Sequence, residues 1–158
     1  MVLALLTALA VIALRLILHT IGAPPQGTDF MLVHFLAIVT IVFFIDMRLL
    51  RRNRAAGFPD LMREGFKGAA LYALLLMAYL WFHYTAIEDD AFSKRIEAMV
   101  LQAVEEGQPE RIVRPRLTRF FTPFNYASIS FFALLATGAF NALLIGAIHH
   151  KLLRRAMR

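Results

Sequence analysis

The chain of 158 residues contains no cysteine, and charged residues make up only 18% of it. The absence of cysteine excludes disulfide bridges and thiolate metal ligands. Hydrophobic residues make up 59% of the chain, whereas soluble domains carry roughly 45–50% apolar and about 25% charged residues. Together with a mean hydropathy of +0.63, this composition indicates a membrane protein with little chain left for a soluble catalytic domain.

The sequence also lacks the motifs of the common enzyme classes. It has no glycine-rich phosphate loop, no Gly-x-Ser-x-Gly and no His-Glu-x-x-His. No pair of carboxylates occurs within an apolar stretch, and no His-x-x-x-His spacing offers a zinc site. We therefore expect a protein without enzymatic activity, metal or cofactor.

Four long apolar stretches occupy much of the chain, at residues 2–21, 30–47, 68–87 and 126–148. Each approaches or reaches the roughly 20 residues that a helix needs to cross a bilayer, and each is too continuous for a barrel strand. The first has no basic residue before it and no clear cleavage site after it, so we expect a retained helix rather than a signal peptide. The prediction is an all-α polytopic protein with a single four-helix transmembrane domain over residues 1–158.

The distribution of lysine and arginine predicts how these helices are oriented. The connection between the second and third stretches and the C-terminal tail are rich in basic residues, while the first connection has none. The long third connection, residues 88–125, balances its basic residues with acidic ones. The positive-inside rule then places both termini in the cytoplasm and the third connection outside. The net charge of +6 is thus explained by topology and by attraction to anionic lipids, and we expect no nucleic-acid partner.

The third connection is long enough to fold. Between Asp90 and Glu106 its apolar residues recur at helical spacing, and a second, basic segment over Arg111–Arg119 is interrupted by Pro115. We interpret the first segment as an amphipathic helix on the outer membrane surface that shields the bundle. A docking surface for a partner protein is the alternative.

Several short motifs suggest a family. They are Phe58, Phe66-Lys67-Gly68, the stretch YTAIEDDAF over Tyr84–Phe92, and Phe121-Thr122-Pro123-Phe124 before a fourth stretch rich in small residues. With the four-span layout, the chain resembles the bacterial domain-of-unknown-function family 4199. The resemblance implies a small four-helix protein of the bacterial inner membrane, largely from Bacteroidota. It implies no functional residues.

Four ionisable side chains within the apolar stretches are candidates for a binding site, because such residues are rare and costly in a membrane. Arg15 and His19 lie one helical turn apart, and His34 and His83 fall at a comparable depth near the outer surface. They could bind a lipid phosphate or another anionic substrate, with the acidic residues 88–90 as counter-charges. Alternatively, Arg15 and His19 extend to the headgroups and the other two are interfacial residues. A proton-linked role and a metal site are weaker alternatives.

Two further polar positions lie at the inner ends of the stretches. Asp46 lies beside Arg48 and the basic second connection, and we predict an ion pair at the membrane interface. His149 and His150 end the fourth stretch, where we interpret them as interfacial anchors.

The fourth stretch carries a packing motif. Gly138, Ala142 and Gly146 are spaced by four, which forms a ridge of small residues that another helix can approach closely. Asn141 lies beside the ridge and could donate a hydrogen bond across the contact. The ridge could contact a helix of the same chain or form an oligomer interface.

Two functions are compatible with these features. The first is a non-catalytic accessory or structural subunit of a membrane complex, as the small size, the few buried polar groups and the small-residue ridge suggest. Its partners would be other membrane proteins or further copies of the chain. The second is a carrier or accessory for a lipid-linked or anionic substrate. They differ in whether Arg15 faces the bundle interior or the headgroups, which the apolar residues around the whole first stretch leave undecided.

Overall fold

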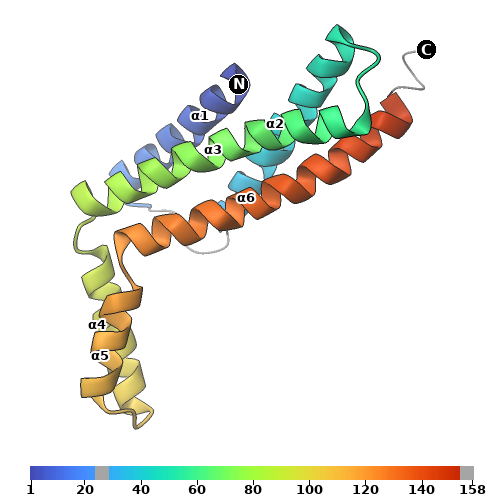
Figure 1. The fold of residues 1–158 in the computed structure, drawn as a ribbon. Helices are drawn as coiled ribbons and strands as arrows, with labels where there is room; N and C mark the ends of the chain where they lie inside the picture. The colour runs from blue at the N-terminus through green and yellow to red at the C-terminus, as the bar shows by residue number, and fades with distance from the viewer. Residues whose placement is uncertain (24–28, 154–158) are drawn as a thin grey trace. The chain divides into compact units, whose positions relative to one another are not determined.

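The computed structural model of the protein describes residues 1–23 and 29–153. This part of the chain folds into six α-helices and one π-helical segment, with no strand among the described residues (Figure 1). The elements are α1 (Val2–Thr20), α2 (Asp29–Arg52), α3 (Phe58–Ala86), α4 (Ala91–Glu105), α5 (Glu110–Phe120), α6 (Pro123–Ile148) and η1 (His149–Leu153). Four of them, α1, α2, α3 and α6, are long and apolar enough to cross a membrane. The expected all-α polytopic fold is confirmed.

Helix α3 begins earlier than its apolar stretch predicts. It starts at Phe58 rather than at residue 68, because the charged residues before the stretch are good helix formers. Two of them, Glu64 and Lys67, form an ion pair of 2.6 Å along the helix. Hydropathy therefore locates the part of α3 that can lie in a membrane, and helix propensity adds the charged first turns.

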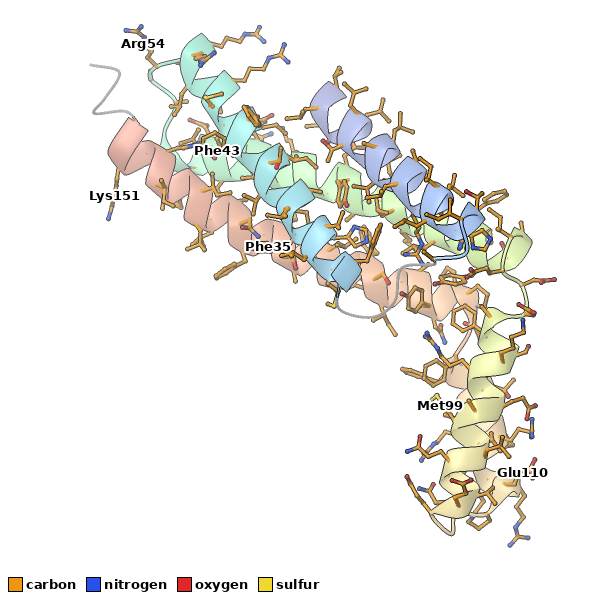
Figure 2. The ribbon with its side chains drawn as sticks, turned by 180° about the vertical axis from the view of Figure 1, so that it is seen from behind. Phe35, Phe43, Arg54, Met99, Glu110 and Lys151 are labelled. Atoms are coloured by element: carbon orange, nitrogen blue, oxygen red, sulfur yellow. The ribbon has the colours of Figure 1, made fainter. Side chains whose placement is uncertain are left out.

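The chain divides into two compact units. The first comprises residues 1–76 together with the chain from residue 131 onward, and the second comprises residues 77–130. In the first unit, the connection between α2 and α3 and the end of α6 lie at the same end, and α1 starts nearer to this end than it finishes (Figure 1). We call this the loop end of the bundle. Basic residues such as Arg54 and Lys151 are found there (Figure 2).

Helices α3 and α6 pack closely along the ridge of small residues. A Cβ atom added at Gly138 would lie 2.5 Å from the Cβ of Ala69, and one added at Gly65 would lie 3.6 Å from the Cβ of Ala142. At Gly146 the corresponding atom would lie 3.6 Å from the Cβ of Leu61. Both helices thus contribute residues spaced by four to one antiparallel contact. The ridge of α6 is used within the chain.

Large apolar side chains cover the outer surface of the first unit. On α2, Phe35 and Phe43 are 43% and 38% exposed (Figure 2), while Ile38, Ile41 and Val42 between them are completely buried. A soluble protein of this size does not expose apolar side chains so extensively. The pattern is that of helices whose outer faces contact lipid.

The second unit contains a hairpin formed by α4 and α5. Its apolar core consists of Ile96 and Val100 from α4 and Val113 and Leu117 from α5. The expected apolar face of α4 is therefore covered by α5, which leaves little of that face to contact a membrane surface. Gly107, with φ of +83°, lies in the turn between the helices, where a left-handed conformation favours glycine.

The expected interruption of the basic segment at Pro115 is wrong. Helix α5 runs from Glu110 to Phe120 with Pro115 inside it. A proline within a helix removes one backbone hydrogen bond. Val113 and Leu117, before and after the proline, pack against α4 in the hairpin core.

Candidate polar sites in the bundle

Arg15 lies on the buried face of α1. This face also carries Ala4, Ala8 and Val11, and Arg15 itself is only 7% exposed. Its guanidinium carbon lies 5.6 Å from the centre of the Phe30 ring at the start of α2, within the range of a cation–π interaction. Arg15 is therefore directed toward α2 rather than away from the protein toward the headgroups.

His34 of α2 links the Arg15–Phe30 contact to α3. Its Nδ1 lies 2.6 Å from the hydroxyl oxygen of Tyr72, a hydrogen bond between α2 and α3. The Phe30 ring contacts the imidazole edge-on, with 5.1 Å between the ring centres. We call these four residues, Arg15, Phe30, His34 and Tyr72, the Arg15 cluster.

Tyr72 was not among the residues that the sequence predicts for a site. It is completely buried within α3. A tyrosine in the middle of an apolar stretch is a signal in itself, because a buried hydroxyl group needs a hydrogen-bond partner. Sequence alone does not show that His34 is this partner, since the two residues lie on different helices.

The other two predicted candidates, His19 and His83, differ in their surroundings. His19 lies one turn beyond Arg15 on α1 and is partly exposed. His83 belongs to the second unit, where it is 2% exposed. Its Nδ1 lies 3.3 Å from the Tyr79 hydroxyl oxygen, and its Nε2 lies 3.5 Å from a carboxylate oxygen of Glu88. Glu88 is one of the acidic residues that the sequence suggests as counter-charges.

A second polar site lies near the loop end of the first unit. Asp46 of α2 and His149 of η1 are both 0% exposed, and the Asp46 Oδ2 lies 3.6 Å from the His149 Nδ1. Asp46 thus faces a buried histidine, and the expected ion pair at the membrane interface is wrong. His149 is likewise an interior residue rather than an anchor at the membrane surface.

Asn141 forms its hydrogen bond within its own helix. Its side-chain amide donates to the backbone carbonyl of Thr137 at 2.9 Å, one turn earlier in α6. This bond satisfies a donor that would otherwise be buried in the helix contact. The expected hydrogen bond from this amide nitrogen across the ridge is therefore wrong.

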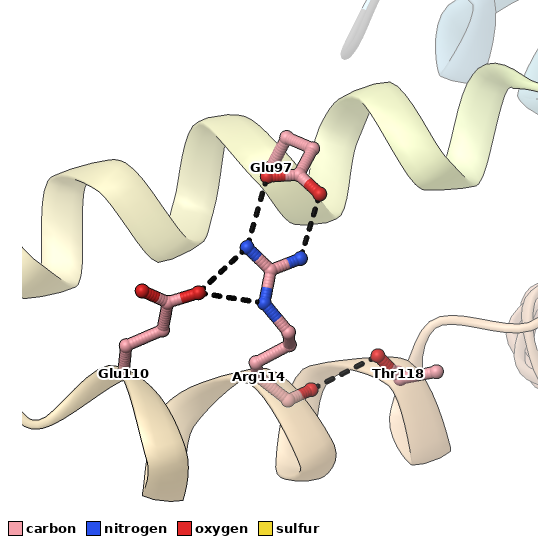
Figure 3. A network of polar contacts seen from close by, with 4 residues as sticks. All are labelled: Glu97, Glu110, Arg114 and Thr118. Atoms are coloured by element: carbon pink, nitrogen blue, oxygen red, sulfur yellow. Dashed lines mark hydrogen bonds and ion pairs between the residues drawn. The ribbon is translucent and has the colours of Figure 1, made fainter.

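A network of exposed ion pairs links the two helices of the hairpin. Arg114 of α5 forms two hydrogen bonds to the Glu97 carboxylate of α4, at 2.6 and 3.1 Å, and one of 2.9 Å to Glu110 (Figure 3). The hydrogen bond from Arg114 lowers the pKa of Glu97, and the two carboxylates raise the pKa of Arg114. The bidentate geometry orients the helices, although exposed ion pairs contribute little energy each.

No model of a known protein family matches the chain, and neither a characterised protein nor a solved structure similar to it was found. The resemblance to the domain-of-unknown-function family 4199 therefore stays a prediction.

Proposed function

We propose that the protein binds an anionic group within its transmembrane bundle and serves as a carrier or accessory for a lipid-linked or anionic substrate. The observation that carries this proposal is the position of Arg15, buried on the face of α1 and directed toward α2. A guanidinium offers a planar fork of donors that matches a phosphate or a carboxylate. A charged side chain at membrane depth is costly, so its presence favours a functional role.

The rest of the Arg15 cluster suits the same role. The Phe30 ring stabilises the guanidinium through its face, and the His34–Tyr72 hydrogen bond fixes two more polar groups nearby on α2 and α3. These polar groups come from three different helices, so a bound anion would stabilise the packing of all three. Binding at this site would thereby be coupled to the arrangement of the bundle.

Two features that favour a purely structural subunit in the sequence differ in the structure. The first was the small number of buried polar groups. Among the described residues, however, Arg15, Asp46, His83, Asn141 and His149 are all buried. The second was the small-residue ridge of α6, which contacts α3 of the same chain and so provides no argument for an external partner.

We place the protein in the bacterial inner membrane with both termini cytoplasmic. The support comes from the basic residues around the loop end, where the α2–α3 connection and η1 lie (Figure 2). The positive-inside rule assigns such an end to the cytoplasm. Placing the protein in the bacterial inner membrane follows the family resemblance.

The test uses lipid retention. Purified protein is reconstituted in nanodiscs containing phosphatidylglycerol and phosphatidylethanolamine, and native mass spectrometry measures which lipid stays bound. We expect the wild type to retain the anionic lipid and Arg15→Gln to retain about tenfold less, since a hydrogen bond to a charged group contributes about 1.5–3 kcal/mol.

The matched control is Arg48→Gln, which removes an exposed arginine of α2. This variant keeps the lipid if retention depends on Arg15 rather than on total charge. Circular dichroism and gel filtration check that both variants fold. Equal retention by Arg15→Gln and the wild type, both correctly folded, would rule out a lipid phosphate as the anion; the same result with inorganic phosphate and acetate as probes would reject the site.

The second candidate function is a non-catalytic accessory subunit, and the α4–α5 hairpin favours it. The hairpin lies outside the candidate membrane spans and has its own apolar core and ion-pair network. Such an element can present a charged surface to a partner without disturbing the spans. If this role holds, replacing residues 91–120 by a short flexible linker abolishes co-purification with membrane partners while anionic lipid retention persists. Unchanged co-purification would exclude the hairpin as the docking element.

A further inference from the structure

Asp46 and His149 form the most enclosed polar group among the described residues of the bundle. Both are 0% exposed, and neither the two carboxylate oxygens nor the two imidazole nitrogens have a hydrogen-bond partner. An unpaired charge in such a place is very unfavourable, and buried ionisable groups in membrane helices commonly mark ion or proton pathways. This pair is separate from the Arg15 cluster and is not needed for the anion site proposed above.

The backbone around the pair leaves room for the carboxylate. Gly65 of α3 lies directly beside it, and a Cβ added there would lie 3.1 Å from the Asp46 Oδ1 and 3.0 Å from a methyl group of Val42. The Phe43 ring contacts the His149 ring edge-on, with 4.8 Å between their centres. Gly65 thus lies beside the carboxylate and Phe43 beside the imidazole.

His149 also lies where the helical hydrogen-bonding pattern changes. The α-helical hydrogen-bonding pattern of α6 ends at Ile148, and the π-helical segment η1 begins at His149. Short π-helical segments are rare and are frequently found at functional sites. Here the change of pattern coincides with the residue that faces Asp46.

The neighbouring charged groups do not neutralise the pair. On α3, Glu64 is partly exposed and Lys67 is exposed, and the two pair with each other at 2.6 Å. On α2, Arg48 is exposed, and on η1 Lys151 is exposed and His150 contacts Phe58, with 6.4 Å between the ring centres. On α1, residues 2–14 contain no ionisable side chain, and its two ionisable residues, Arg15 and His19, lie in the last two turns.

The charge of the pair depends on its protons. With Asp46 ionised and His149 neutral the pair carries one negative charge, and with both protonated it carries one positive charge. Only the state with one added proton is neutral overall, whether the proton is on the carboxylate or on the imidazole. In a medium of low dielectric constant this state is strongly favoured over both charged ones.

We propose that Asp46 and His149 together form a site that binds a single proton. The proton comes from a hydronium ion at the loop end and forms an O–H bond on Asp46 or an N–H bond on His149, which leaves a water molecule behind. Because Nδ1 and Oδ2 are 3.6 Å apart, longer than a hydrogen bond, one group carries the proton and the other stabilises it by charge or polarity. Gain or loss of this proton changes the bundle's charge by one unit.

The test determines whether His149 or Asp46 carries that proton in the folded, full-length protein. Protein labelled with ¹⁵N at its five histidines is reconstituted in nanodiscs, and His149→Gln identifies the His149 signals. Spectra are recorded about one unit above the ordinary histidine pKa of about 6.5. Infrared spectra of the same samples report any protonated carboxylic acid. We expect either an imidazolium signal from His149 or a carboxylic-acid carbonyl band that Asp46→Asn removes.

Two variants separate a shared proton from one held by a single residue. If His149 carries the proton, Asp46→Asn should abolish the imidazolium signal at the same pH, while Glu64→Gln, which removes a partly exposed carboxylate next to Gly65, should leave it unchanged. If Asp46 carries it, only Asp46→Asn should remove the infrared band. A wild type with His149 neutral and no protonated carboxylic acid would overturn the proposal, and this result needs no variant to fold. An imidazolium signal that survives Asp46→Asn would also overturn it.

Discussion

Replacement of Gly138 by alanine tests the packing of α6 against α3 most sharply. The added Cβ would lie 2.5 Å from the Cβ of Ala69, whereas two carbon atoms in contact are about 3.5–4.0 Å apart. Because the Ala69 Cβ is attached directly to the backbone, no side-chain rotation relieves the overlap, and the helices must separate by about 1 Å. Overpacking of this kind costs about 1–3 kcal/mol.

Gly146 provides the matched control on the same ridge. An alanine there makes only ordinary contacts, at 3.5 Å to the Met62 backbone nitrogen and 3.6 Å to Leu61. We therefore expect Gly146→Ala to be at least as stable as the wild type, because alanine is a better helix former than glycine by about 0.5–1 kcal/mol. Helix propensity contributes little to the difference between the two variants, because each replaces a glycine by alanine within the same helix.

The assay is reversible unfolding in mild detergent with increasing dodecyl sulfate, followed by circular dichroism or by a fluorescent pair on α3 and α6. Gly138→Ala should unfold at a lower dodecyl sulfate fraction than both Gly146→Ala and the wild type. Adding Ala69→Gly should restore much of the loss, since it removes the overlapping atom. Equal stability of the two alanine variants would show that α6 does not pack on α3 in this register.

Three further predictions concern the other contacts. Tyr72→Phe removes the hydrogen bond to His34 and should lower the unfolding free energy by about 1 kcal/mol, measured by the same titration; no loss would mean that the bond does not form in the bilayer. Leu117→Ala should destabilise the hairpin by about 2–5 kcal/mol, seen as faster amide exchange in α4 and α5 while the spans stay protected; uniform protection would contradict a separate hairpin core. Because Arg114 lowers the pKa of Glu97, their ion pair stabilises the hairpin above the unfolded carboxyl pKa of about 4.3 and is lost as the pH falls through the lower folded value. In Arg114→Gln the Glu97 pKa, followed by carbon NMR, should rise toward its ordinary value, and an unchanged pKa would argue against the pair.

The sequence predicts the spans well because crossing a bilayer depends on average apolarity, which a sequence states directly. The predicted first stretch, residues 2–21, differs from α1 by a single residue at its end. The start of α3 at Phe58 was missed for the opposite reason, since charged helical turns outside a membrane have no hydropathy signal. For the hairpin, the spacing of apolar residues predicted α4, but it did not show that α5 would cover them.

The polar sites were predicted only in part. Arg15 and His34 were identified because ionisable residues in apolar stretches are rare. Their arrangement depends on which face of each helix points inward, and helices that are apolar on all sides leave this undecided in the sequence. For the same reason Asp46 was assigned to an ion pair with the basic residues that follow it in the sequence, although it contacts His149 of another helix.

The direction of Arg15 is the central claim, and site-directed spin labelling tests it directly. Because the chain has no cysteine, single cysteines at positions 14 and 15 can be labelled without background in liposomes. Collision with dissolved oxygen then reports exposure to lipid. Leu14 is 41% exposed and Arg15 is 7% exposed, so the label at position 14 should collide with oxygen far more often than the label at 15. Equal or greater oxygen accessibility at position 15 would contradict an inward Arg15 and the binding site built on it.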